Sequence, residues 1–271
     1  MGQVLVIVIL GTLTYSIIEG PVHGFDSPEI VGLLVLCAAA LVTLLWYEPR
    51  RRQPLLDLRF FRSTPFSGAT VIAVSAFAAF SGFLFLNTLY LQDVRGLSAL
   101  DAGLLTLPMA AMTIIVSPLS GALVGRRGAR LPLMAAGVAL TVGSLMLTGL
   151  TTSTSYGWLL ASYLIFGIGF GLVNPPITNT AVSGMPPAQA GVAAAVASTS
   201  RQVGQALGVA VIGVAATAGL DGDLGRGLAT SSHPGWWIIV ACSAAVLVLG
   251  FLSTTARAFR SAARIEPLFE A

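Results

Sequence analysis

Charged residues are scarce in this chain of 271 residues. Asp, Glu, Lys and Arg make up only 9% of it, while 55% of the residues are hydrophobic and the mean hydropathy is +0.87. Soluble domains carry about 25% charged residues. This composition excludes an ordinary soluble globular domain and indicates a protein whose main partner is the lipid bilayer.

Lysine is absent, so the net charge of +3 depends on 14 arginines. These arginines lie between apolar runs rather than on one soluble face, which argues against a nucleic-acid partner. The two cysteines, Cys37 and Cys242, lie inside apolar runs and indicate packing residues, with no disulfide framework or metal spacing.

Motifs of enzymes and of ATP-driven pumps are also missing. The chain has no GxxxxGK[ST] and no HExxH, and it has only two histidines. We therefore expect no enzyme, no metal and no bound cofactor.

Eight apolar runs are long enough to cross a bilayer, which takes about 20 residues. No stretch alternates with period two, so a β-barrel is not expected, and helices satisfy every backbone group within lipid. The first run lacks a basic n-region and a small-residue cleavage site, and indicates a span rather than a signal peptide. The sequence predicts an all-α, polytopic membrane protein with transmembrane helices at residues 2–19, 30–47, 66–91, 101–123, 131–150, 158–178, 188–216 and 235–255.

The arginines predict the orientation of these helices, because positive loops stay in the cytoplasm. One set of connections holds eleven arginines, whereas the alternate set holds only Arg95 and Arg226. Both termini are therefore predicted to be cytoplasmic. The arginines of the richer set are Arg50, Arg51, Arg52, Arg59, Arg62, Arg126, Arg127, Arg130, Arg257, Arg260 and Arg264.

The longest basic connection, residues 49–65, divides the chain. It is either a solvated linker or a segment whose leucines and phenylalanines lie in the headgroup layer. On this basis we expect two transmembrane helices in 1–48, a cytoplasmic loop in 49–65, six helices in 66–255 and a cytoplasmic tail in 256–271.

Arg201 is the most informative polar residue. The seventh run is about 28 residues, or roughly 42 Å as a helix, and Arg201 lies about 13 residues from its start. A charge within hydrocarbon costs at least ~2.5–3.5 kcal/mol, so it needs a partner or a water-filled cavity. The alternative is a side chain that snorkels toward cytoplasmic phosphates. No carboxylate is evident at the same depth.

Other polar residues in the runs are candidates for a substrate path, although each could equally form a bond between helices. Glu19 and His23 are better interpreted as interfacial residues than as a proton relay. The substrate-path candidates are Asn87, Tyr90, Gln92, Asn174, Gln202 and Gln205.

Glycines crowd the sixth and seventh runs. They permit close helix crossings, either as static packing, which we favour, or as a sliding surface. Pro175 and Pro176 are expected to end the sixth helix. The glycines concerned are Gly167, Gly169, Gly171, Gly204 and Gly208.

The connection between the fourth and fifth runs reads GALVGRRGARLPL from Gly121 to Leu133. By itself it is an ordinary positive loop in which glycines let two helix ends approach. It also resembles the GxLaDRxGRkxxL motif of the major facilitator superfamily, with Gly125 where that family has Asp and Ala129 where it often has a basic residue. The resemblance implies a cytoplasmic gating loop that includes Gly121, Gly125, Arg126, Gly128 and Arg130.

Further stretches are similar to the 14-helix drug:proton antiporter branch of that superfamily. They are GIGFGLVNPPIT from Gly167, TSRQVGQALG from Thr199, PLLDL from Pro54 and LYLQ from Leu89. The resemblance implies that 1–48 is the central helix pair, that 66–255 is the C-terminal half with inverted repeats at about 66–150 and 158–255, and that the N-terminal six-helix half is missing.

The same resemblance implies the function. We expect part of a multidrug or small-amphipathic-compound exporter of the plasma membrane, which works by alternating access and uses a proton gradient in place of a cofactor. The fragment is expected to be inactive without its partner half, because the coupling acid is not evident here. The alternative is a non-transporting membrane protein, such as a truncated product or a scaffold for helices.

Overall fold

The computed structural model describes residues 2–24, 26–47, 58–183, 185, 189–217 and 232–265. These residues form helices joined by short turns, with no β-strand in any of the described ranges. The all-α prediction is therefore confirmed. The chain divides into two compact units, Met1–Arg62 and Ser63–Ala271.

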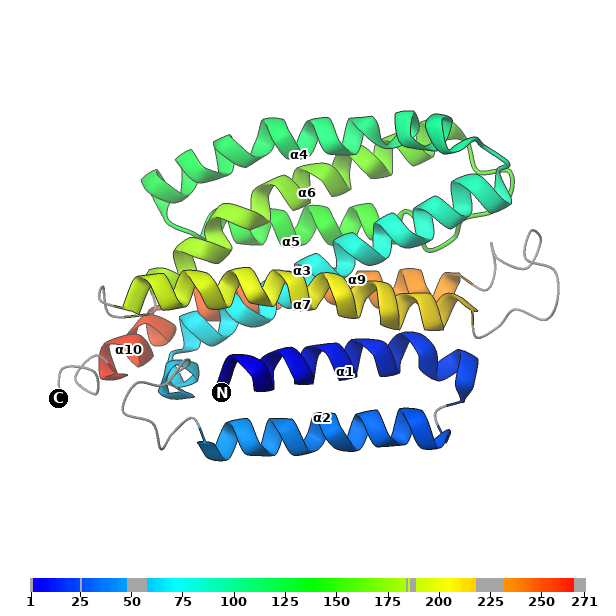
Figure 1. The fold of residues 1–271 in the computed structure, drawn as a ribbon. Coiled ribbons are helices and arrows are strands. Elements are labelled where there is room, and N and C mark those ends of the chain that lie inside the picture. The colour runs from blue at the N-terminus through cyan, green and yellow to red at the C-terminus, as the bar shows by residue number, and fades with distance from the viewer. Residues whose placement is uncertain are drawn as a thin grey trace. The chain divides into compact units, whose positions relative to one another are not determined.

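The first unit is a helical hairpin. Helices α1 (Gly2–His23) and α2 (Pro28–Tyr47) pack side by side (Figure 1). The last residues of the unit form a short 3-10 helix, η2 (Leu58–Arg62). Residues 49–57 of the basic connection lie outside the described residues, so the choice between a linker and a headgroup-layer segment stays open.

The second unit contains six long helices and one short one in its described part. It begins with α3 (Thr64–Leu89), which continues through a π-helical turn, η3 (Tyr90–Val94), and is followed by α4 (Ala99–Arg127) and α5 (Arg130–Leu145). The chain then forms α6 (Tyr156–Ser183), α7 (Ala190–Thr217) and α9 (His233–Ser253), and ends in α10 (Ala256–Ile265). Each of the eight predicted runs coincides with one long helix.

Among the described residues, six helices are long and apolar enough to cross a membrane: α1, α2, α3 with η3, α4, α6 and α9. Helix α5 is also apolar but has only 16 residues. Helix α7 has 28 residues, and its arginine, glutamines and many small residues lower its hydropathy. The prediction of a polytopic membrane protein is confirmed.

Helices α3 and α6 form the centre of the second unit. They contact each other; α3 also packs against α7 and α9, and α6 packs against α4 and α5 (Figure 1). Aromatic side chains fill the centre, where the Phe83 ring stacks on Phe166 at 4.5 Å and meets Trp236 edge-on at 6.0 Å. Helices α5 and α9 also pack together.

The glycines are sites of close helix approach. A Cβ atom at Gly167 would lie 2.5 Å from the backbone oxygen of Met109 on α4, and one at Gly169 would lie 2.6 Å from the backbone nitrogen of Leu140 on α5. On α7, a Cβ at Gly208 would collide with the carbonyl of Ala78 on α3. Glycine is therefore required for these crossings as they are packed here. Static packing and a sliding surface both need such close contacts, so the choice between them stays open.

Two predicted helix ends are wrong. Helix α6 continues through Pro175 and Pro176 to Ser183, because a proline inside a membrane helix is tolerated when neighbouring helices support the backbone. Helix α5 ends at Leu145 rather than near residue 150. A turn follows directly, in which the backbone N–H of Leu147 donates to the carbonyl of Ser144 at 3.0 Å. The tail after α9 is helical as far as Ile265.

Candidate functional site

The half-buried side chain of Arg201 joins α7 to α6. Its Nη2 atom donates a hydrogen bond to the hydroxyl of Thr178, 23 residues earlier in the chain. The Nε atom of Arg201 is buried without a hydrogen-bond partner among the described residues. The guanidinium is therefore only partly satisfied, and it retains a donor for a further group.

Arg201 lies in the first half of α7. It lies eleven residues after Ala190, the first residue of α7, which corresponds to about 17 Å along the helix. Side chains in a helix lean toward its N-terminus, and the N-terminus of α7 is the predicted cytoplasmic end. Thr178 likewise lies only five residues before the end of α6. The side chain therefore points back toward the N-terminal end of α7, the predicted cytoplasmic end, and it ends on the hydroxyl of Thr178.

The glutamines next to Arg201 lie on the open side of α7. Gln202 and Gln205 are both exposed, together with the small hydroxyl residues Ser198 and Thr199 one turn earlier. Helix α7 thus presents a narrow polar stripe, whereas the middle of α4 exposes leucines and isoleucines, among them Leu107, Ile114 and Leu119.

The other substrate-path candidates lie elsewhere. Asn174 is half-buried on α6, in the turn before Thr178, and Gln92 is half-buried in η3. Asn87 and Tyr90 are fully buried near the end of α3. The structure therefore does not bring the predicted candidates together in one place.

Asn87 and Tyr90 belong to a separate polar cluster. The hydroxyl of Tyr163 on α6 donates to the side-chain oxygen of Asn87, and the hydroxyl of Tyr90 donates to the carbonyl of Thr151 at 2.6 Å. These bonds connect the end of α3 to α6 and to the connection that precedes α6. They are bonds between helices, and a place of Asn87 and Tyr90 on a substrate path stays a prediction.

Arg95 completes this cluster. Its Nη1 atom donates to the Tyr90 hydroxyl at 3.2 Å and to the Thr154 carbonyl at 2.6 Å, and its Cζ atom lies 4.6 Å from the centre of the Tyr156 ring. The hydrogen bond to Tyr90 is the main cause that raises the pKa of Arg95. Arg95 thus acts as a clasp at the predicted outer end of the unit.

The predicted cytoplasmic gating loop is mostly helical. Gly121, Gly125 and Arg126 lie in the last turns of α4, and Arg130 begins α5, so Gly128 and Ala129 alone connect the two helices. Gly128 has a φ of 78°, a conformation that favours glycine.

The expectation that these glycines allow two helix ends to approach is wrong. A Cβ at Gly121, Gly125 or Gly128 would meet no described atom within 4 Å. A glycine is favoured at Gly128 because its φ angle is positive. Lack of space is not the reason, since no described atom is close.

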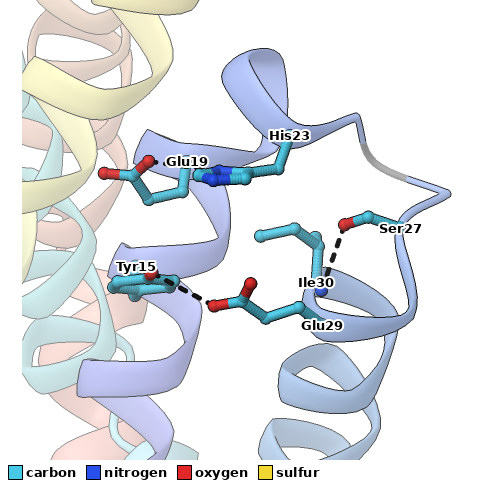
Figure 2. A network of polar contacts seen from close by, with 6 residues as sticks. All are labelled: Tyr15, Glu19, His23, Ser27, Glu29 and Ile30. Carbon is cyan, nitrogen blue, oxygen red and sulfur yellow. Dashed lines mark hydrogen bonds and ion pairs between the residues drawn. The ribbon is translucent and has the colours of Figure 1, made fainter.

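A smaller polar network lies at one end of the α1–α2 hairpin. Figure 2 shows the Tyr15 hydroxyl of α1 donating to the carboxylate of Glu29 on α2 at 3.2 Å. The His23 Nδ1 atom lies 3.3 Å from the Glu19 carboxylate one turn earlier in the same helix. Both contacts are at least partly exposed, and the interfacial position of Glu19 and His23 stays a prediction.

In each of the two units, the described carboxylates lie at helix ends or in turns. Among the described residues they lie at the end of α1, in the turn before α2, at the start of α2, in η3 and at the start of α4. These residues are Glu19, Asp26, Glu29, Asp93 and Asp101. All belong to the predicted outer side, and within the described part of the chain no group of His, Cys, Asp and Glu could hold a metal ion.

The sequence did not reveal the hydrogen-bond partners of Arg201 and Asn87, which are Thr178 and Tyr163. Thr178 and Tyr163 are ordinary residues of a long apolar helix, and their partners lie 23 and 76 residues away. Arg95 was counted only as one of two outer arginines. A local pattern cannot reveal such pairs, because only the packing of α6 against α3 and α7 brings them together.

Comparison with known proteins gives the family. The sequence model described as "Major Facilitator Superfamily" matches residues 1–209. The chain belongs to the major facilitator superfamily. The predicted superfamily is confirmed, and this multi-pass protein belongs to the cell membrane.

Several curated members of the superfamily are similar to this chain. The Multidrug resistance protein Stp of Mycobacterium tuberculosis H37Rv is 38% identical over 223 residues, which cover 82% of this chain and 41% of the relative. The Tetracenomycin C resistance and export protein of Streptomyces glaucescens is 34% identical over 203 residues, covering 74% and 38%.

A third relative, the Drug efflux pump JefA of M. tuberculosis H37Rv, is 30% identical over 225 residues, covering 83% of this chain and 44% of the relative. The chain thus spans about two fifths of the length of these relatives.

Proposed function

We propose that this chain is the C-terminal part of a proton-coupled exporter of drugs or other small amphipathic compounds, of the 14-helix antiporter branch. The observation that carries the proposal is the superfamily match over residues 1–209, together with relatives named for drug resistance, export and efflux. In this proposal, 1–48 is the central helix pair and 66–255 is the C-terminal half.

The helix contacts support two inverted repeats, about 66–150 and 158–255. If the two repeats are equivalent, α3 corresponds to α6, α4 to α7 and α5 to α9. The contact α3–α7 then corresponds to α6–α4, and the contact α3–α9 corresponds to α6–α5. All four pairs are close contacts in the structure, and the pairs α3–α6 and α5–α9, which this correspondence leaves unchanged, are also present. Such a two-fold relation is the architecture of alternating-access transporters.

The polar stripe of α7 supports a substrate path. Gln202 and Gln205 lie on its open side, and the small side chains of Ser198 and Thr199 beside them leave room for a bulky compound. Arg201 lies at the edge of this stripe with one donor still without a partner among the described residues. We propose that the stripe faces the other half of the transporter, where Arg201 meets a carbonyl or a carboxylate of that half.

Proton coupling requires a titratable group within or near the cavity. The described carboxylates all lie at the predicted outer ends of helices, whereas Arg201 lies nearer the predicted cytoplasmic end of α7. We propose that the coupling acid belongs to an N-terminal half that corresponds to the remaining length of the relatives, and that the 271 residues alone do not transport.

The second candidate is a non-transporting membrane protein that scaffolds other helices. The many glycine crossings fit either candidate, because they serve tight packing in both. The polar stripe on α7 favours the transporter, since exposed glutamines have no evident role in a passive bundle facing lipid.

A chimera tests the proposal. This chain replaces the matching region of the M. tuberculosis multidrug resistance protein Stp, and dye efflux is measured in an efflux-deficient host with and without an uncoupler. The chimera should export dye only when the proton gradient is intact, whereas the chain alone at equal membrane abundance should leave dye accumulation unchanged. Proton-dependent efflux by the chain alone, or none from a well-inserted chimera, contradicts the proposal.

A further inference from the structure

A groove runs along the exposed face of α5 from its first turn. Its walls are apolar, with Leu131, Met134, Val138 and Val142 from α5 and Ile165 from α6, and its volume is about 820 Å³. The small side chains of Ala135 and Ala139 form the hollow between these larger side chains. Helix α5 packs on α6 and α9 and only weakly on α4, which leaves this face open.

Two arginines close one end of the groove. Arg127 is the last residue of α4 and Arg130 the first residue of α5, and both line the groove and are exposed. The Cζ atom of Arg130 lies 4.9 Å from the centre of the Phe251 ring on α9, which holds the guanidinium at the mouth. Within the described part of the chain, neither arginine forms an ion pair with a carboxylate.

The start of α5 adds further positive character at the same end. The residue that precedes it, Ala129, offers no side-chain cap to its first backbone N–H groups. An uncapped helix N-terminus carries a partial positive charge and favours an anion. Two guanidiniums and one helix end thus favour an anionic group at this mouth, and no described acid competes for them.

The dimensions fit one leaflet of a bilayer. From Leu131 to Val142 the helix rises about 17 Å, and half of the hydrocarbon core is about 15 Å. The arginines lie at the predicted cytoplasmic end, where the leaflet carries anionic lipids. A cationic amphipathic drug would be repelled at the same mouth.

We propose that the groove along α5 binds an anionic phospholipid of the cytoplasmic leaflet, with its phosphate between Arg127 and Arg130 and one acyl chain along α5. Arginine suits the phosphate because its planar fork donates two parallel hydrogen bonds. This site is separate from the polar stripe on α7 and does not depend on drug transport.

Native mass spectrometry of the purified 271-residue chain tests the headgroup contact. The chain is titrated with phosphatidylglycerol and with phosphatidylcholine of identical acyl chains. Wild type should prefer phosphatidylglycerol, and R127Q/R130Q should weaken that binding about tenfold or more, as expected from the loss of two charge-assisted contacts. The control R257Q/R260Q removes the same charge from exposed residues of α10 and should change binding less than about twofold.

A second pair of variants tests the acyl chain. Ala135→Phe fills the groove and should weaken phosphatidylglycerol binding, whereas Ala110→Phe on the exposed side of α4 should not. Equal binding of the two lipids, equal effects of the two arginine pairs, or no effect of Ala135→Phe overturns the proposal. Displacement of the lipid by glycerol 3-phosphate at equal concentration also overturns the proposal, because the ligand would then be a free phosphate. A dimer that Ala135→Phe abolishes overturns it as well, because the groove would then bind a second copy of the chain.

Discussion

The guanidinium of Arg201 on α7 donates a hydrogen bond to the hydroxyl of Thr178 on α6, about 17 Å along α7 from its start. The bond satisfies part of a charge that is costly within a membrane and leaves the buried Nε atom without a partner among the described residues. A neutral partner and a spare donor are compatible with a guanidinium that meets a second group from outside this chain.

Replacement of Arg201 should separate transport from insertion. In the chimera with the N-terminal part of Stp, Arg201→Ala should lower the rate of dye efflux by about tenfold while membrane abundance stays unchanged, because a lost charge-assisted contact is worth about 1.5–3 kcal/mol. Arg201→Lys should restore only part of the rate, since an ammonium lacks the planar fork. Efflux and surface abundance are measured in the same cells.

A comparison variant for Arg201 is Gln202→Ala, at the exposed neighbour on the same helix. It should affect efflux of one dye more than another if it lines the substrate path. Normal efflux of Arg201→Ala would show that Arg201 is only a snorkelling anchor.

The clasp at the outer end should contribute to stability. Tyr90→Phe removes the bond to Thr151 and one of the bonds of Arg95, and should lower the free energy of unfolding by about 1–2 kcal/mol. Unfolding of the purified chain in mixed micelles, followed by tryptophan fluorescence, measures this. Tyr15→Phe removes an exposed hydroxyl and should cost less than about 0.5 kcal/mol; equal losses for both tyrosines contradict the clasp.

Two glycines of α7 should respond differently to replacement by alanine. Gly208→Ala places a methyl group against the Ala78 carbonyl and the Ser81 hydroxyl of α3, and should destabilise the chain by about 1–3 kcal/mol. At Gly191 no described atom lies within 4 Å of the added Cβ, so Gly191→Ala should be neutral or stabilising by up to about 1 kcal/mol. The same unfolding measurement checks both, and similar effects at the two sites would mean that the α3–α7 crossing is not tight.

The arginine distribution makes a topology prediction that packing alone does not test. In a variant without Cys37 and Cys242, a cysteine at Ser155 should react with an impermeant maleimide added to intact cells. A cysteine at Arg127 or Arg260 should react only after the membrane is opened. All three positions are exposed, so a lack of reaction reports the side of the membrane. Labelling of the Arg127 site in intact cells would refute the predicted orientation.

The sequence by itself determined which segments are helices that belong in a membrane. Apolar runs of this length have no other stable arrangement in lipid, and each of the eight coincides with a helix. The ordered motifs also indicated the superfamily before any contact was known. The predicted helix end at Pro175 was wrong because neighbouring helices support the backbone of α6 beyond its prolines. Helix α5 ends at Leu145, before the predicted end near residue 150.

Only the tertiary structure decided which polar groups meet. Tyr163 pairs with Asn87 and Thr178 with Arg201 because α6 packs against both α3 and α7. The arginines beside Gly128 indicated an ordinary loop in the sequence, but a two-residue turn places them at the mouth of an apolar groove. A sequence records spacing along one helix, whereas these pairs depend on the angle and distance at which separate helices cross.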